Sequence, residues 1–345
     1  SITLIIEDSQ TDPATGTAAM AKLAEADQVH AAVGAFASSV SGAAVDVAVR
    51  NKIPLLSPGS TSPVFTERAE KGDFNGYWAR TAPPDTYQAQ ALAQLASDKG
   101  FSNVSTVVIN NDYGVGFERS FVEAFEALGG TIVNKDNPTR YDPNAATFES
   151  EAAAAFSGNP DAVVAVLYAE TGSLLLKSAY EQGLTDNVQI MLTDGVQTEA
   201  FPEDVGQTAD GSYILTGAIG TVPGAGGNAL EDFATLWRDE MGEAPGAFVA
   251  HTWDAAALVA LAAEAAGTNS GPEIQAQMLN VSSGGTEVTD VCQGLELIRT
   301  GEDIDYQGAS GNVDIDEFGD VVGNYDVWTV TDDGKIEVID QVKLN

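Results

Sequence analysis

The sequence predicts an α/β protein with two lobes, each a doubly wound parallel sheet. Apolar runs of strand length alternate with amphipathic helical patterns along most of the chain. Polar, Gly-bearing loops follow several of these runs, as in Asn110–Gly116 between the apolar run Val104–Ile109 and the helical pattern Phe117–Leu128. A length of 345 residues favours two domains over one. Ligands of open α/β sheets bind at the carboxyl ends of strands, so these loops are candidate sites.

The first series of elements occupies the N-terminal part of the chain. Pro13 is suited to a first helical turn, and an apolar run before Pro58 is typical of a short buried strand. The predicted strands are Ile2–Ile6, Val29–Phe36 and Ile53–Ser57, and the predicted helices are Ala14–Ala26 and Val40–Arg50.

A Pro-Pro pair at residues 83–84 interrupts the pattern and predicts a crossover between the lobes. Asp85 can cap the helix that follows it. The second series contains the predicted strands Val104–Ile109, Thr131–Val133, Ala162–Tyr168, Gln189–Thr193 and Tyr213–Thr216, and the helices Thr86–Lys99, Phe117–Leu128, Ala145–Phe156 and Ser173–Gln182.

The Gly-rich stretch 217–227 predicts the return crossover, and three helices follow it at Ala229–Met241, Ala247–Ala266 and Pro272–Leu279. The tail alternates like strands, first over residues 313–318 and then over 325–330. Asp332-Asp333-Gly334 is a candidate hairpin turn.

The charge of the chain is strongly negative: 15 Lys and Arg stand against 51 Asp and Glu, a net of −36. Such a surface repels itself in dilute salt, and concentrated salt screens that repulsion. We therefore expect a halophilic protein; an ordinary acidic protein is the alternative. Nucleic acid is excluded as a partner because it requires clustered Lys and Arg.

The single cysteine, Cys292, excludes an internal disulfide and is typical of a small buried hydrophobe. No apolar run is long enough to span a bilayer, and no signal peptide is recognisable. The chain begins at Ser1 inside an apolar run, from which we expect that sequence upstream has been removed or is absent.

Two loops of the first series carry candidate anion-binding groups. Ser38 and Ser39 open a helix, where they are either N-caps or donors that hold an anion at the positive helix end. Gly59, Ser60 and Thr61 follow the next strand, where Gly allows close backbone approach and Thr61 offers a hydroxyl. Two such loops side by side favour a carboxylate cradle, although turn chemistry alone also explains them.

Three residues of the second series suit a ligand ammonium. Tyr113 and Tyr168 each follow an apolar strand and supply a ring face and a hydroxyl, or are half-buried packing residues. Asp194 follows Gln189–Thr193 and is either a cap or the partner of an ammonium group. A buried charged pair needs several hydrogen bonds, which the tyrosines could supply.

Other chemistries lack their signatures. Phosphate-loop, zinc, nucleophile-elbow and complete dinucleotide-binding patterns are absent, so we expect no cofactor and no metal. Asp314, Asp316 and Asp320 lack the spacing of a calcium loop and predict a solvated hairpin. Without a recognisable nucleophile–base pair, we expect no enzyme.

The order of several short motifs resembles the leucine/isoleucine/valine-binding proteins, extracellular solute-binding proteins of ABC importers with the type I periplasmic-binding fold. The resemblance covers nearly the whole chain. The matching segments are Ile5–Pro13, Val33–Ser39, Leu56–Pro63, Arg80–Asp85, Asp112–Gly116, Gly183-Leu184 and Gly246–Val249.

This resemblance implies site roles and domain boundaries. Ser38 and the Gly59–Thr61 segment match residues that bind the ligand α-carboxylate; Tyr113 and Tyr168 match tyrosines of the second lobe. Asp194 stands where the family places an acidic residue, usually Glu, against the α-ammonium. Lobe 1 is expected over residues 1–80 and 219–322 and lobe 2 over residues 81–218 and 323–345, with crossovers near 80–84, 216–219 and 322–326.

Two departures from the family accompany these matches. The family's first βα unit does not precede Ser1, and we expect it in the natural protein. Ala37 stands at a position of the family's lobe-1 disulfide.

The resemblance implies a monomer that binds a small aliphatic or branched-chain amino acid between its lobes and delivers it to an ABC permease at the membrane. It also implies an extracellular location, anchored as a lipoprotein through an N-terminal segment. The alternatives are a binding protein for another small ligand, such as an amide or a carboxylate, and the ligand-binding domain of a sensory receptor.

Overall fold

The computed structural model describes residues 2–342, and the chain forms two compact units. Unit 1 comprises residues 1–84 and 225–323; unit 2 comprises residues 85–224 and 324–345. The chain thus passes between the units after residues 84, 224 and 323. The sequence predicts these crossings after residues 80, 218 and 322.

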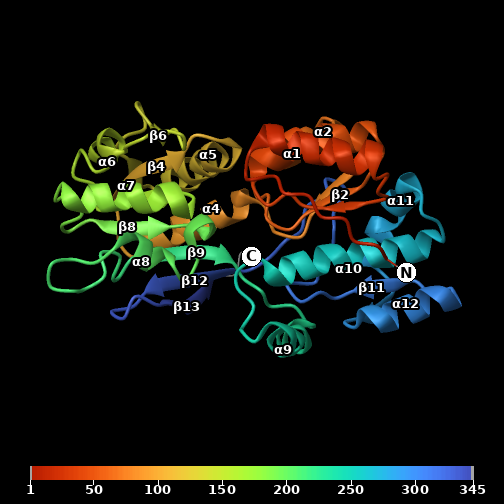
Figure 1. The fold of residues 1–345 in the computed structure, drawn as a ribbon. Coiled ribbons are helices and arrows are strands. Elements are labelled where there is room, and N and C mark those ends of the chain that lie inside the picture. The colour runs from red at the N-terminus through yellow and green to blue at the C-terminus, as the bar shows by residue number, and fades with distance from the viewer. Residues whose placement is uncertain (1, 343–345) are drawn as a thin grey trace. The chain divides into compact units, whose positions relative to one another are not determined.

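Unit 1 is built on short parallel strands with helices on both faces. Its strands are β1 (Ala32–Val33), β2 (Leu55–Ser57), β3 (Trp78–Arg80), β10 (Thr286–Val288) and β11 (Ile304–Tyr306), and its helices are α1 (Pro13–Ala21), the π-helix Lys22–Ala26, α2 (Ser38–Arg50), α3 (Val64–Glu70), α9 (Leu230–Met241), α10 (Val249–Ala266), α11 (Gly271–Ser282) and α12 (Val291–Thr300). The first three strands form a parallel sheet in the order β1-β2-β3, and β10 pairs with β11. Figure 1 shows α1 and α2 on one side of β2 and α10 on the other.

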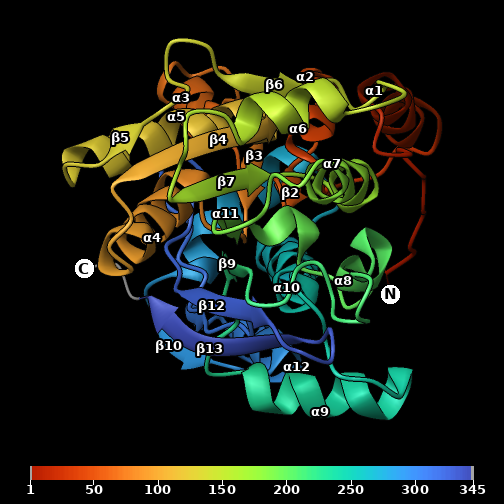
Figure 2. The ribbon, with the colours of Figure 1, turned by 90° about the vertical axis from the view of Figure 1, so that its left-hand side faces the viewer.

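Unit 2 contains one eight-stranded sheet. Its strands are β4 (Asn103–Ile109), β5 (Thr131–Ile132), β6 (Thr139–Tyr141), β7 (Ala162–Val166), β8 (Gln189–Leu192), β9 (Ile219–Pro223), β12 (Tyr325–Val330) and β13 (Ile336–Val342), and its helices are α4 (Asp85–Asp98), α5 (Asp112–Ala127), α6 (Glu149–Ala155), α7 (Ala169–Glu181), a 3-10 turn (Asp194–Val196) and α8 (Phe201–Val205). The order is β13-β12-β9-β8-β7-β4-β5, with β6 also paired to β4, and only the pairs made by β12 are antiparallel. Figure 2 shows α4 and α5 on one side of β4 and β7, and α7 and α8 on the other.

The local sequence explains where α5, the helix predicted to follow the Asn110–Gly116 loop, begins. The prediction starts this helix at Phe117, but α5 begins at Asp112. Asn111 has an extended backbone, and its side-chain oxygen accepts a 3.0 Å hydrogen bond from the Gly114 N–H, which is the geometry of an N-cap. Tyr113 therefore lies in the first turn of a helix instead of in a loop.

Three predicted strands are wrong. Residues 2–6 form no strand, and Ile2, Leu4 and Ile6 are 78–82% exposed. Residues 213–216 are not a strand either. The Gly-rich stretch 217–227 contains the strand β9 as well as the passage to unit 1 after residue 224. Gly220 in β9 faces the indole of Trp328, where an added Cβ would lie 2.4 Å from the ring, so the glycine serves close packing.

The third wrong strand prediction concerns residues 313–318, which form no strand. Asp316 accepts hydrogen bonds from the N–H groups of Phe318 and Asp320 and folds this segment into a tight turn. Such Asx turns compete with strand formation. The strand Val29–Phe36 shortens to Ala32–Val33, and the segments α3, β3, β6 and α12 were not foreseen.

Candidate functional site

The predicted site residues form two clusters, one in each unit. In unit 1 they lie on α2 and on residues 58–63 after β2, which we call the Thr61 loop. In unit 2 the predicted residues Tyr113, Tyr168 and Asp194 follow β4, β7 and β8. Together with Thr193 and with Gln88 of α4, we call them the Asp194 cluster. Each cluster follows the carboxyl ends of parallel strands of its own unit.

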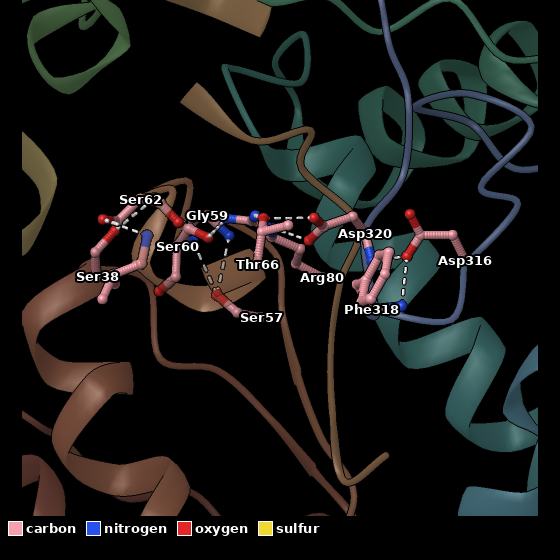
Figure 3. A network of polar contacts seen from close by, with 11 residues as sticks. Ser38, Ser57, Gly59, Ser60, Ser62, Thr66, Arg80, Asp316, Phe318 and Asp320 are labelled. Atoms are coloured by element: carbon pink, nitrogen blue, oxygen red, sulfur yellow. Dashed lines mark hydrogen bonds and ion pairs between the residues drawn. The ribbon is translucent and has the colours of Figure 1, made fainter. Parts of the chain in front are cut away.

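The Thr61 loop is held by serine hydroxyls (Figure 3). Ser57 Oγ accepts hydrogen bonds from the N–H groups of Gly59 (3.3 Å) and Ser60 (2.9 Å). Ser38 Oγ accepts one from the Ser62 N–H at 3.2 Å. The Ser60 hydroxyl bonds to the Phe36 carbonyl and to Ser41. The Ser38 and Ser60 side chains thus shape the loop from within.

Thr61 differs from its neighbours because its hydroxyl is not used. It is fully buried, and its Oγ1 has no hydrogen-bond partner among residues 2–342. Leaving a buried hydroxyl unpaired costs about 1–3 kcal/mol, so an incoming acceptor at this position recovers that free energy. Of the four predicted side chains in unit 1, Thr61 is the one whose hydroxyl is both buried and unpaired, whereas Ser39 is partly exposed on α2.

An aromatic pair lies beside the loop. The Phe36 ring covers Gly59 so closely that an added Cβ would sit 2.4 Å from it. Phe36 meets Phe248 edge to face, with ring centroids 5.0 Å apart, and Phe36 remains 51% exposed. An exposed aromatic ring next to a polar loop offers an apolar surface to a bound molecule.

In unit 2 the Asp194 cluster joins a carboxylate to two tyrosines. The Tyr113 hydroxyl donates to Asp194 Oδ1 at 3.0 Å and shares a 2.8 Å hydrogen bond with the Thr193 hydroxyl. The rings of Tyr113 and Tyr168 stack with centroids 5.6 Å apart. Asp194 is 8% exposed, and no cationic side chain within the described residues pairs with it.

Burial is the main electrostatic feature of this cluster. Desolvation raises the pKa of Asp194 to about 6, although hydrogen bonds from Gln88 and Tyr113 lower it in part. Desolvation also raises the pKa of both tyrosines, with the charges of Asp194 and Asp85 adding to the effect. The tyrosines are therefore neutral donors, and the cluster presents negative charge that a bound cation would stabilise.

Gly195 is required by the close packing around Asp194. A Cβ at this residue would lie 2.3 Å from the Leu167 carbonyl oxygen and 3.3 Å from the Tyr113 hydroxyl. The glycine therefore lets the turn after β8 approach the end of β7.

We expect Gly195→Ala to destabilise the protein by about 1–3 kcal/mol, because overpacking against backbone cannot relax cheaply. Thermal unfolding measures the loss. Gly246→Ala is the matched control, since nothing lies within 4 Å of its added Cβ. Equal melting temperatures for the two variants would contradict the close approach.

Several functional features escaped the sequence analysis. Gln88 is buried in α4, and its amide donates to the Thr221 carbonyl at 3.0 Å. Asp320, assigned to a solvated hairpin, is 6% exposed and pairs with Arg80 at 2.7 Å. Cys292, expected to be buried, is exposed.

No group of metal-ligating side chains gathers within residues 2–342, and no helix in that range is long and apolar enough to cross a membrane.

Comparison with known proteins places this geometry in context. A family profile described as "Receptor family ligand binding region" matches residues 1–333. The chemotactic signal transduction system substrate-binding protein BasB of Halobacterium salinarum is 25% identical over 96% of this chain and 76% of its own length. The human metabotropic glutamate receptor 8 is 31% identical over 36% of this chain, which is 13% of that receptor.

Solved structures share the fold. A leucine-binding protein from Thermotoga maritima superposes with a TM-score of 0.81 at 23% identity, over 99% of this chain and 87% of the other. A branched-chain amino acid transporter substrate-binding protein from Streptococcus pneumoniae, in complex with isoleucine, gives 0.78 at 22% over 99% and 87%. A solute-binding protein from R. palustris with 4-hydroxybenzoate gives 0.77 at 19% over 99% and 85%. The fold is therefore that of the type I periplasmic binding proteins.

Proposed function

From the premise that this chain belongs to the receptor family ligand binding region, we propose that it is an extracellular solute-binding protein of an ABC importer. Its ligand is a small aliphatic or branched-chain amino acid, delivered to a permease at the membrane. We further propose that the protein acts as a monomer and is anchored as a lipoprotein.

The observation that carries this proposal is the buried Asp194, which has neutral hydrogen-bond donors and no cationic partner within residues 2–342. Burying an unpaired carboxylate is costly, and a ligand ammonium would supply the missing charge. The Tyr113 hydroxyl already fixes the carboxylate by donating to Oδ1. An anion without an amine would instead meet repulsion here.

The features of unit 1 suit the other two parts of an amino-acid ligand, its carboxylate and its side chain. The unpaired Thr61 hydroxyl suits the α-carboxylate, and the exposed Phe36 ring suits an aliphatic side chain. We propose that Ser38, Ser39 and residues 59–61 form the carboxylate-binding half of the site. Tyr113, Tyr168 and Asp194 form the ammonium-binding half.

Three matched ligands test the assignment by calorimetry: leucine, 4-methylpentanoate, which lacks the amine, and 3-methylbutylamine, which lacks the carboxylate. Leucine is expected to bind at least about a hundredfold more tightly than either analogue, since each leaves a buried polar group unpaired. Preference for 4-methylpentanoate would overturn the ammonium assignment and favour a carboxylate-binding protein.

The sensory alternative differs in partner and not in ligand. The name of BasB places that relative in a chemotactic signal transduction system. Cross-linking of the ligand-loaded protein in its own membranes distinguishes the partners. Recovery of a permease supports the importer, whereas recovery of a transducer would replace it with a sensory role.

The raised pKa of Asp194 predicts that amino-acid affinity depends on pH. The ammonium needs the ionised carboxylate, so at pH values below the Asp194 pKa of about 6 the Asp194 carboxyl must release a proton when the ligand binds. We expect the dissociation constant for leucine to be roughly tenfold larger at pH 5 than at pH 7. The tyrosines and Asp85 surround this group; the tyrosines stay neutral across that range because their pKa values are raised.

Calorimetry in buffers of different ionisation enthalpy measures the proton release directly. In Asp194→Asn the affinity for leucine should no longer change between pH 5 and pH 7. An unchanged affinity between pH 5 and pH 7 in the parent protein would contradict the role of this carboxylate.

A further inference from the structure

Arg80 is a fully buried cation at the end of β3, and all parts of its guanidinium are engaged (Figure 3). Nη1 donates to the carbonyls of Ser60 (3.1 Å) and Ser62 (2.9 Å). Nε donates to Asp320 Oδ1 at 2.7 Å. The two carbonyls flank Thr61, so one side chain fixes the backbone on both sides of the unpaired hydroxyl.

Asp320 is itself held in place. Its Oδ2 accepts a 2.6 Å hydrogen bond from the Thr66 hydroxyl, which in turn accepts one from Arg80 Nη2 at 2.9 Å. The Asp316 carboxylate accepts from the Asp320 N–H at 2.9 Å and closes the turn that presents Asp320. The carbonyl of Gly319 accepts from the Arg80 N–H at 2.8 Å, which ties this turn to β3.

We propose that Arg80 and Asp320 are positioning residues that hold the Thr61 loop in its ligand-binding conformation. This inference rests on the proposed function, because the two residues would order the carboxylate-binding half of the same site. The Ser38, Ser57 and Ser60 hydroxyls hold the Thr61 loop on the side of α2 and β2. The Arg80–Asp320 ion pair holds it on the side of β3 and the 316–320 turn.

The chemistry of the pair fits positioning better than stability. A buried ion pair is seldom more stabilising than apolar residues of the same volume, because both charges lose hydration. A guanidinium, however, has donors in a rigid planar fork that can bond two carbonyls and a carboxylate at once. A lysine ammonium at this position keeps the charge but cannot make the same set of contacts.

Three variants remove parts of this arrangement to different degrees. Arg80→Lys loses the fork, Asp320→Asn loses the charge, and Thr66→Val loses only the hydroxyl that links the other two. Asp254→Asn is the control. Asp254 is a buried carboxylate of the same unit that bonds to Tyr306, Ala309 and Ser310 and not to the Thr61 loop.

Amide hydrogen exchange of residues 58–66, measured without ligand, is the first readout. Arg80→Lys and Asp320→Asn are expected to speed exchange there at least about tenfold, beyond any change caused by Asp254→Asn. Arg80→Lys loses the forked bonds to the Ser60 and Ser62 carbonyls, and Asp320→Asn weakens the charged contact that orients the Arg80 guanidinium. Thr66→Val should move it less and in the same direction. Exchange equal to that of the Asp254→Asn control would overturn the proposal.

Leucine affinity, measured on folded protein well below the melting temperature, is the second readout. Arg80→Lys and Asp320→Asn are expected to weaken it roughly tenfold or more, while Asp254→Asn leaves it within about twofold. A loosened loop with unchanged affinity would refute a positioning role. Failure of the parent protein to bind any amino acid would sink the proposed function instead, and the exchange experiment would still decide whether the pair orders the loop.

Discussion

Asp194→Ala is expected to weaken amino-acid binding by roughly two to three orders of magnitude and to leave the fold intact. Breaking a buried charged pair costs about 3–5 kcal/mol, because the remaining charge, here the ligand ammonium, is left without a partner. The Tyr113 hydroxyl also loses one of its two hydrogen-bond partners and keeps Thr193. Titration calorimetry with leucine measures the loss, and circular dichroism checks the fold.

The ligand-free variant should be at least as stable as the parent protein. Burial raises the pKa of Asp194, which means that its charged form is disfavoured in the folded state. Asp194→Asn keeps the shape and removes the charge, so it should also melt no lower than the parent. Glu118→Gln is a matched control, because Glu118 is a buried carboxylate of unit 2 whose bonds go to Thr106 and Arg140. Unchanged leucine affinity in Asp194→Ala would refute the ammonium assignment.

The second large effect is that of salt on stability. A net charge of −36 acts across the whole chain, and ion pairs such as Arg68–Asp46 lie at the surface, where each contributes little. At 1 M salt the Debye length is about 3 Å, which removes repulsion between all but neighbouring carboxylates. We expect the melting temperature to rise by roughly 10 °C or more between 0.1 M and multimolar KCl, since about 2–4 °C corresponds to 1 kcal/mol for large domains.

Differential scanning calorimetry across a KCl series measures this rise. Sucrose at matched osmolality is the control, because an excluded solute favours the compact state without screening charge. A melting temperature that responds equally to sucrose and KCl, or to neither, would contradict the expectation of a halophilic protein.

The sequence predicted those parts of the molecule whose signals are local. Strand-to-helix transitions after apolar runs located β4, β7 and β8, and with them Tyr113, Tyr168 and Asp194. The α/β class also follows from such patterns, because burial of both faces of a parallel strand leaves a continuous apolar run. Residues 2–6 carry the same signal without forming a strand, since an apolar run records a preference and not a pairing partner.

Features that depend on distant contacts were out of reach. Arg80 and Asp320 are 240 residues apart, and nothing near either residue indicates the other. The strand around Gly220 was missed because the packing partner of this glycine, the Trp328 indole, lies far along the chain. Likewise, the unpaired state of the Thr61 hydroxyl depends on how the Ser38 and Ser60 side chains are used.

The measurement that tests the central claim most directly is a thermal-shift screen in multimolar KCl against the twenty amino acids, their amides and short carboxylates including benzoate. A ligand at a hundredfold excess over its dissociation constant stabilises the folded state by about 2.7 kcal/mol. We predict a shift with aliphatic amino acids and none with carboxylates that lack an amine. A shift with benzoate or another such carboxylate, and with no amino acid, would contradict the account of Asp194 and of the ligand.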